Sequence, residues 1–198
     1  GAAQATTTGG RGRMRDRHPE VWATAPLGAV GKLIRGVSFS GADAEVFPKS
    51  GYLPVLRAGN ISTELIVDRD LVWIPGARIS EEQRMRRGDI AICMSSGSGA
   101  VVGKTAPLTT DWKGSVGAFC AIIRPQDNVS AEFLSHYLAG PQFAQWRRSQ
   151  AQGANIQNLR SSELDQVRIP LPPLSEQRQI IMILREAESI YRLHERTE

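Results

Sequence analysis

The sequence predicts an α+β domain in which a mixed, twisted β-sheet carries flanking helices and ends in a coiled-coil-like helix. Short apolar segments of three to six residues, separated by Gly, Pro and Asp, run from Val21 to about Pro125 and indicate strands. Helical periodicity begins only after Ser130, and the last segment of the chain has heptad-like spacing. Strands that are followed by helices, without regular alternation, are typical of this class.

Length and composition are those of an ordinary globular domain. The 198 residues are enough for one substantial core, and 41% hydrophobic and 22% charged residues are typical of soluble proteins. No apolar run approaches the roughly 18–20 residues that span a bilayer, and no signal-peptide pattern opens the chain. Cys93 and Cys120 lie in apolar stretches, so we expect two reduced, buried thiols in a cytoplasmic protein without a membrane partner.

Residues 1–20 are predicted to be a flexible leader or linker, because they are rich in Gly, Ala, Thr and Arg and lack apolar periodicity. Their four arginines, against Asp16 and Glu20, supply +2 of the net charge of +4. Bulk charge therefore permits DNA binding but does not argue for it. Twenty of the 24 basic residues are Arg, which suits phosphates and guanine edges, although a GC-rich genome would produce the same bias.

The strand candidates share β-branched content and neighbouring turn residues. They are Tyr52–Leu56, Leu71–Ile74, Asp89–Met94, Val101–Gly103 and Ala118–Ile123.

The helices are expected from residue 130 onward. Ser130 can cap a helix, and Pro141 can start a second one. Residues 151–160 are polar and form a loop, and a Ser-x-x-Asp pattern at Ser162 predicts a brief helical turn. Val167–Pro173 is predicted to be extended, because its prolines fit neither a helix nor a central strand.

Residues 175–198 are predicted to form one helix, with Ser175 as its N-cap. Its apolar side chains repeat at intervals of four and three residues, which gives one narrow seam. The seam consists of Ile180, Leu184, Ala187 and Tyr191, and His194 continues the same spacing. Such a seam favours packing against a partner helix, and the alternative is a terminal helix that folds back onto its own domain.

A glycine-rich stretch, Ser98–Thr105, resembles the phosphate-binding loop of nucleotide hydrolases. Its spacing does not fit, because Ser98 replaces the first required glycine and Pro107 follows where a helix should begin. We interpret the stretch as a hairpin loop between two strands. Such a loop can approach a phosphate backbone closely, with Ser96, Ser98 and Lys104 as donors.

No pattern predicts catalysis. The three histidines are scattered, and neither cysteine has a partner at metal-ligand spacing. Leu171–Leu174 has two prolines but lacks the amide and the aromatic residue of an adenine methyltransferase motif. We therefore expect no catalytic residue, no metal and no cofactor in this chain.

Four ordered segments resemble the target-recognition domains of type I restriction–modification specificity subunits. They are Leu27-Gly28 with 31–36, 51–61, 87–92 with 99–104, and 153–159 with 169–180. Full-length members of that family carry two recognition domains and two long helices, whereas this chain has one of each. We expect a half-length subunit, a fragment, or the recognition end of a fused adenine methyltransferase, and the first residue, Gly rather than Met, is compatible with the last two.

The resemblance implies a function in DNA recognition. Residues 21–174 would be the recognition domain, with loops that enter the major groove of double-stranded DNA. Residues 175–198 would dock onto an adenine-N6 DNA methyltransferase, which alone would bind S-adenosylmethionine. A restriction subunit and self-association through the last helix are further expected interactions. The rival hypothesis is a protein-interaction module without direct base readout.

Candidate DNA contacts divide into phosphate anchors and base readers. The anchors are cations and hydroxyls: Lys32, Arg35, Ser96, Ser98, Lys104, Lys113 and Arg160. The readers are side chains that can pair with base edges: Arg57, Asn60, Asn155, Gln157 and Asn158. Two residues have a competing interpretation. Asn60 can instead bond its own backbone in a turn, and Trp112 can either face the DNA or cap the core.

Overall fold

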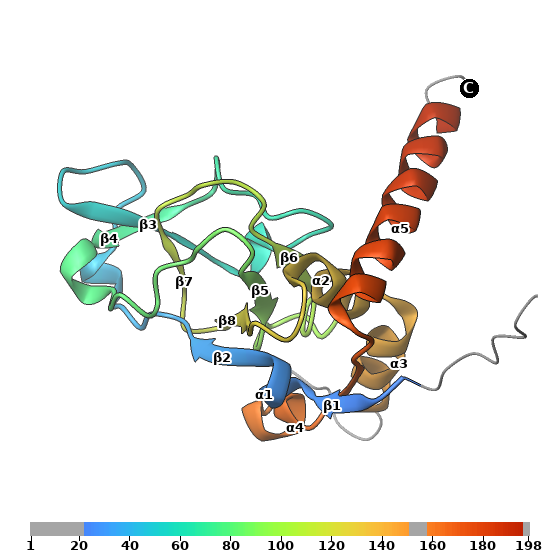
Figure 1. The fold of residues 1–198 in the computed structure, drawn as a ribbon. Helices are drawn as coiled ribbons and strands as arrows, with labels where there is room; N and C mark the ends of the chain where they lie inside the picture. Colours follow the sequence, from blue (N-terminus) through green and yellow to red (C-terminus); the bar gives the residue numbers. More distant parts are fainter. Residues whose placement is uncertain (1–21, 151–157, 196–198) are drawn as a thin grey trace, which may run out of the picture.

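The computed structural model describes residues 22–150 and 158–195, in which strands and helices form a mixed α+β fold, as predicted (Figure 1). The strands of the described residues pair in three small sheets rather than in one. The largest sheet is antiparallel and has four strands in the spatial order β2, β8, β5, β6. These strands are β2 (Gly31–Arg35), β8 (Cys120–Pro125), β5 (Ile90–Cys93) and β6 (Thr105–Pro107).

A second sheet has three strands, with β3 (Tyr52–Leu56) between β4 (Val72–Pro75) and β7 (Ser115–Val116). The β3–β4 pair is antiparallel and the β3–β7 pair is parallel. Close to the chain ends, β1 (Thr24–Pro26) pairs with β9 (Arg168–Pro170), so that residues far apart in sequence lie side by side.

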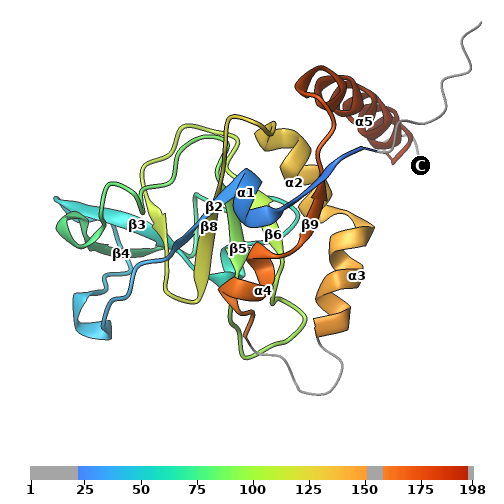
Figure 2. The same ribbon diagram turned by 60° about the horizontal axis from the view of Figure 1, so that its bottom comes forward.

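Helices cover one side of the four-stranded sheet, while the β3–β4 hairpin lies at the opposite end of the molecule (Figure 2). Ser130 caps α2 as expected, because its Oγ accepts a hydrogen bond from the Phe133 amide at 3.5 Å. The α-helices are α1 (Leu27–Val30), α2 (Ala131–Ala139), α3 (Pro141–Gln150), α4 (Ser161–Asp165) and α5 (Leu174–Glu195). Three short 3-10 helices are Gly41–Asp43, Ala58–Asn60 and Gly76–Arg78.

Strand β5 is buried on both faces, because alternate residues enter two different apolar clusters. Ile90 and Ile92 pack toward the helices, in the cluster that contains Leu134 of α2. Ala91 and Cys93 face the other cluster, together with Leu56 of the three-stranded sheet and other residues. The four-stranded sheet is therefore the central layer of the fold.

The expected strand Val101–Gly103 is wrong, since these residues form a turn and the strand begins at Thr105. The Val101 amide donates to the Ser98 carbonyl at 3.2 Å, and the Gly103 amide donates to the Cys93 carbonyl at 2.7 Å. Gly103 has φ = 75°, a left-handed conformation that an apolar β-branched residue would not tolerate. The two β-branched residues at 101 and 102 therefore belong to a turn and do not pair in a β-sheet.

Both helices begin two residues earlier than their expected N-caps imply. Helix α4 begins at Ser161 with Arg160 as N-cap, so Ser162 lies inside the helix. Helix α5 begins at Leu174, because the amides of Glu176 and Gln177 both donate to the Pro173 carbonyl.

The two cysteines are free and buried, as expected. Cys93 and Cys120 lie directly opposite each other on β5 and β8. A hydrogen bond between the two thiols, followed by burial, raises the pKa of Cys120, while the same hydrogen bond lowers the pKa of Cys93. The pair is a structural feature of the sheet interior.

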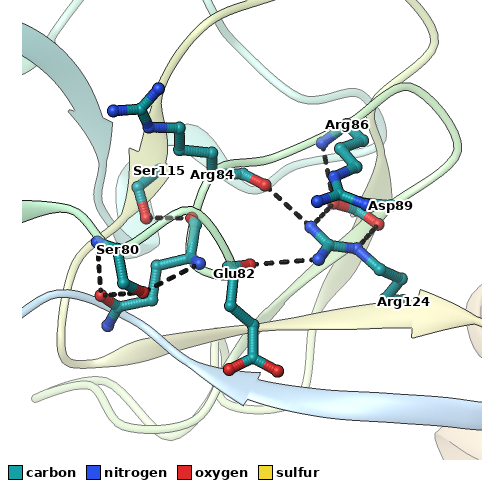
Figure 3. A network of polar contacts seen from close by, with 8 residues as sticks. Ser80, Glu82, Arg84, Arg86, Asp89, Ser115 and Arg124 are labelled. Atoms are coloured by element: carbon teal, nitrogen blue, oxygen red, sulfur yellow. Dashed lines mark hydrogen bonds and ion pairs between the residues drawn. The ribbon is translucent and has the colours of Figure 1, made fainter.

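A buried ion pair fixes the loop that precedes β5 (Figure 3). Arg124 of β8 donates from Nε and Nη2 to the two carboxylate oxygens of Asp89, at 2.9 and 2.8 Å. The same guanidinium donates to the carbonyls of Glu82 and Arg84, and the Arg86 amide donates to Asp89 at 2.8 Å. The carboxylate bond raises the pKa of Arg124. We call this arrangement the Asp89–Arg124 clamp.

Helix α5 combines the two alternatives that its sequence left open. Its first turns pack on the domain: Gln177 and Ile181 are buried, and Gln177 Oε1 accepts from the Ser130 amide at 2.7 Å. Arg185 then forms an ion pair with Glu132 of α2. Glu188 lies 3.8 Å from His136 of α2, and after this contact the helix extends away from the body (Figure 1).

The predicted seam of α5 is only partly covered. Ile180 is half-buried against the core, whereas Leu184, Ala187 and Tyr191 are exposed. Within residues 22–150 and 158–195, no helix has the combination of length and apolar character required to cross a membrane.

Candidate nucleic-acid interface

A concavity with a volume of about 730 Å³ lies where the four-stranded and three-stranded sheets meet, and we call it the groove. Its walls come from chain segments at strand ends: residues 37–39 after β2, 57–60 after β3, Asp70 before β4, 95–97 after β5, and 117–120 at the start of β8. Because each segment leaves or enters a strand of the core, the groove has a rigid frame.

Close backbone packing holds two walls of the groove together. The Gly36 amide donates to the Cys120 carbonyl at 3.1 Å, and the Val37 amide donates to the Val116 carbonyl at 2.8 Å. A Cβ atom at Gly36 would lie 2.1 Å from the Gly117 carbonyl oxygen. A glycine is therefore required at position 36, where the sequence resemblance placed the end of its first motif.

Arg57 is exposed and lines the groove directly after β3. Its Nη2 donates to the carbonyl of Asp70 at 3.3 Å, and Asp70 has φ = 56°. This contact orients the guanidinium while using only one of its five N–H donors. The remaining donors suit a guanine edge or a phosphate.

The structure favours the turn interpretation of Asn60, because its side chain bonds the backbone of its own loop. Asn60 is only 2% exposed, and its Oδ1 accepts a hydrogen bond from the Arg57 amide at 2.9 Å. Nδ2 donates to the carbonyls of Ile66 and Arg69 at 3.2 and 3.0 Å. An amide with these bonds cannot reach a base without breaking the loop. It fixes the backbone of Arg57 instead.

The glycine-rich loop joins β5 to β6 as a hairpin, as its sequence indicated. Ser96 lines the groove, and its Oγ accepts from the Ser98 amide at 3.2 Å. Ser98 and Lys104 are exposed on the same loop but do not line the groove. A phosphate-binding loop would run from a strand into a helix, whereas this loop returns into a strand.

Asn158 is exposed and lies beside this loop. It forms a β-bridge with Ser95, and the Leu159 amide donates to the Met94 carbonyl at 2.7 Å. The structure thus brings Asn158 next to a groove wall. Asn155 and Gln157, the other two predicted readers of this segment, lie outside the described residues.

Two predicted anchors are already engaged in ion pairs. Lys32 of β2 pairs with Glu82, and this contact lowers the pKa of the Glu82 carboxyl. Arg160 lies 3.5 Å from the Glu163 carboxylate. Both cations are exposed at the surface, but each must share its charge with an acid, which weakens its attraction for a phosphate.

The remaining predicted contacts lie outside the groove. Arg35 is exposed at the end of β2, two residues before the groove begins, and Lys113 is exposed just before β7. Trp112 is half-buried against the cluster that contains Leu56, and a Cβ atom at Gly114 would lie 2.3 Å from its ring. For Trp112, the structure favours the core-capping interpretation.

The sequence prediction missed Phe119, which lines the groove and is 69% exposed. We expected this residue inside a strand spanning Ala118–Ile123, yet β8 begins only at Cys120. The available signal was Gly117, a turn residue immediately before the apolar run.

Residues 19–198 match the family model described as the type I restriction modification DNA specificity domain. The chain belongs to this family. It is 39% identical over 164 residues to the StySPI specificity subunit of Salmonella potsdam, covering 83% of this chain and 35% of that protein. It is also 39% identical over 160 residues to the EcoKI specificity subunit of Escherichia coli K12, covering 81% and 34%. The chain thus spans about a third of the curated relatives it matches.

Solved structures share the fold. The HsdS subunit from Thermoanaerobacter tengcongensis superposes with a TM-score of 0.67 at 24% identity, covering 91% of this chain and 40% of that one. A chain from a study of complex assembly and conformational transition in the type I R-M system gives 0.69 at 22% identity, covering 94% and 43%.

Proposed function

We propose that the chain recognises a specific sequence in double-stranded DNA and directs an adenine-N6 DNA methyltransferase subunit or domain to it. The observation that carries this proposal is the groove, where Arg57 and Ser96 come together between two sheets in a member of a DNA specificity family. Catalysis and S-adenosylmethionine binding belong to the methyltransferase. We place the protein in the cytoplasm, in keeping with its free cysteines.

The contacts would divide between reading and anchoring. Arg57 reads a base edge, with Asn158 and the loop side chains Asn155 and Gln157 as further readers. Exposed cations and hydroxyls outside the groove anchor phosphates and set the orientation of the duplex. The strongest anchors are those without an ion pair of their own in the described residues, namely Arg35, Lys104 and Lys113, with weaker contributions from Lys32 and Arg160.

We further infer a division between residues 21–174, which read DNA, and residues 175–198, which contact the methyltransferase. The exposed side chains of Leu184, Ala187 and Tyr191 on α5 support this division. The same surface could mediate self-association or contact a restriction subunit. Burying it against a partner would remove apolar side chains from water.

The test is a binding selection from random DNA duplexes with the full chain, alone and together with its methyltransferase. We expect one enriched sequence, with tighter binding in the presence of the methyltransferase, because a single domain buries limited DNA surface. Equal binding to all sequences under both conditions would contradict the proposal.

A protein-interaction module without base readout is the second candidate, and the exposed part of α5 is the observation that favours it. The double change Leu184→Asp with Tyr191→Asp separates the two functions. We expect the change to weaken methyltransferase binding and to leave the enriched DNA sequence unaltered, with Glu186→Ala as the control on the same helix. A pure interaction module would lose methyltransferase binding and would never show an enriched sequence.

A further inference from the structure

Phe119 is exposed although the strands on both sides of it are buried. It occupies the third position of the turn 117–120, which is closed by a hydrogen bond from the Cys120 amide to the Gly117 carbonyl at 2.8 Å. The turn connects β7 of one sheet to β8 of the other. Its position places Phe119 among the residues that line the groove, together with Arg57 and Ser96.

The turn is fixed to the ends of two core strands. The Phe119 carbonyl accepts from the amides of Met94 and Ser95, at 2.8 and 3.0 Å, just after β5. The Gly117 amide donates to the Leu56 carbonyl at 2.8 Å at the end of β3. The backbone that carries the ring is therefore immobilised from two sides, and the ring itself has only two rotatable bonds. Little conformational freedom remains to be lost on binding.

We propose that Phe119 reads the methyl group of a thymine in the major groove of the target DNA. A phenyl ring offers no conventional hydrogen bond, so it distinguishes base pairs only by apolar contact. The thymine C5-methyl is the apolar group that base pairs present in the major groove. Stacking on a base face would require the duplex to be unstacked, whereas contact with a methyl group leaves the helix intact.

Location in the groove, rather than exposure alone, supports this assignment, because single exposed apolar residues are common on protein surfaces. Phe47 makes the comparison direct, since it is 76% exposed and does not line the groove. It is therefore the matched control for Phe119. The inference rests on the proposed function of sequence-specific DNA recognition.

The experiment uses the full chain with its methyltransferase and the duplex that the wild type selects. Each thymine of that duplex is replaced by uracil, one position at a time, which removes only the methyl group. We expect the affinity of the wild type to fall about fourfold when uracil replaces thymine at one position of the duplex. This corresponds to about 0.8 kcal/mol, the loss from no longer burying one methyl group. The Phe119→Ala chain should bind the thymine and uracil duplexes equally at that position, and Phe47→Ala should behave as wild type.

The outcomes separate the two proposals. A wild-type chain that selects no sequence overturns both. A wild-type chain that selects a sequence but loses no affinity with any uracil overturns only the Phe119 assignment. The assignment also fails if Phe119→Ala keeps the wild-type preference for thymine over uracil. The uracil series on the wild type needs no variant, so a folding defect in Phe119→Ala leaves that part of the test intact.

Discussion

Replacing Arg124 with Met should destabilise the fold by about 3–5 kcal/mol, because the substitution leaves the buried Asp89 carboxylate without its cation. The substitution removes two charge-assisted hydrogen bonds to Asp89, which at about 1.5–3 kcal/mol each give a loss of that order. The bonds to the carbonyls of Glu82 and Arg84 add less, since both residues are exposed and water can replace the guanidinium. The Arg86 amide remains the one hydrogen-bond donor that the clamp provides to the carboxylate.

The assay is equilibrium unfolding in guanidinium chloride at neutral pH, from which the free energy of unfolding is extrapolated. Arg178→Met is the control, because Arg178 is exposed on α5 and its loss should change stability by less than about 0.5 kcal/mol. The double variant Asp89→Leu with Arg124→Met removes both charges. It should be more stable than Arg124→Met alone, because no unpaired charge stays buried.

Two results would refute this reasoning. One is an Arg124→Met chain within about 1 kcal/mol of the wild type, which would mean that water solvates Asp89 in the folded state. The other is a double variant that is less stable than Arg124→Met alone, which would mean that the Asp89 carboxylate stabilises the fold even without its cation, through the hydrogen bond from the Arg86 amide.

Three further predictions concern binding, helix docking and the thiols. In binding selections, Arg57→Ala should relax preference at one base pair, by about 1–3 kcal/mol of discrimination. Lys104→Ala should instead weaken binding to every duplex and reduce by about one the slope of the logarithm of the binding constant against the logarithm of the salt concentration. If both variants bound DNA like the wild type, the assigned roles would be refuted. Gln177→Leu should cost about 1–3 kcal/mol in denaturant unfolding, because the buried amide side chain bonds backbone groups of two segments, and an unchanged midpoint would contradict this. Cys93 and Cys120 should react with a thiol reagent only after denaturant is added, because both thiols are buried. Rapid labelling of the native chain would show that the sheet opens.

Local sequence patterns predicted the elements whose formation depends on local interactions. Ser130 was identified as a cap because its hydroxyl bonds an amide three residues later, which needs no distant partner. The strand at Tyr52–Leu56 was predicted with its correct bounds, because turn residues flank it on both sides. The expectation of a mixed α+β fold followed from such local signals.

Features that depend on distant pairings could not be predicted in the same way. The separation into three sheets depends on contacts such as Gly117 to Leu56, between segments about sixty residues apart. Phe119 was assigned to a strand because its neighbours are apolar, and only the pairing of β8 with β5 shows that the strand begins after it. Asn60 belongs with the local signals, since the sequence offered the turn interpretation and the structure adds its partners, the carbonyls of Ile66 and Arg69.

The contrast between Asn60 and Arg57 shows how the fold can keep its frame while its specificity changes. Asn60 is buried and fixes the Arg57 amide, whereas the Arg57 side chain is exposed in the groove. Replacing the exposed side chain leaves the buried hydrogen bonds intact, because those bonds involve only the backbone of residue 57. Phe119 follows the same rule, since its carbonyl holds the turn while its ring lines the groove. Substitutions at these two positions should therefore alter base preference at little cost in stability, whereas substitution of Asn60 should unfold the loop on which Arg57 depends.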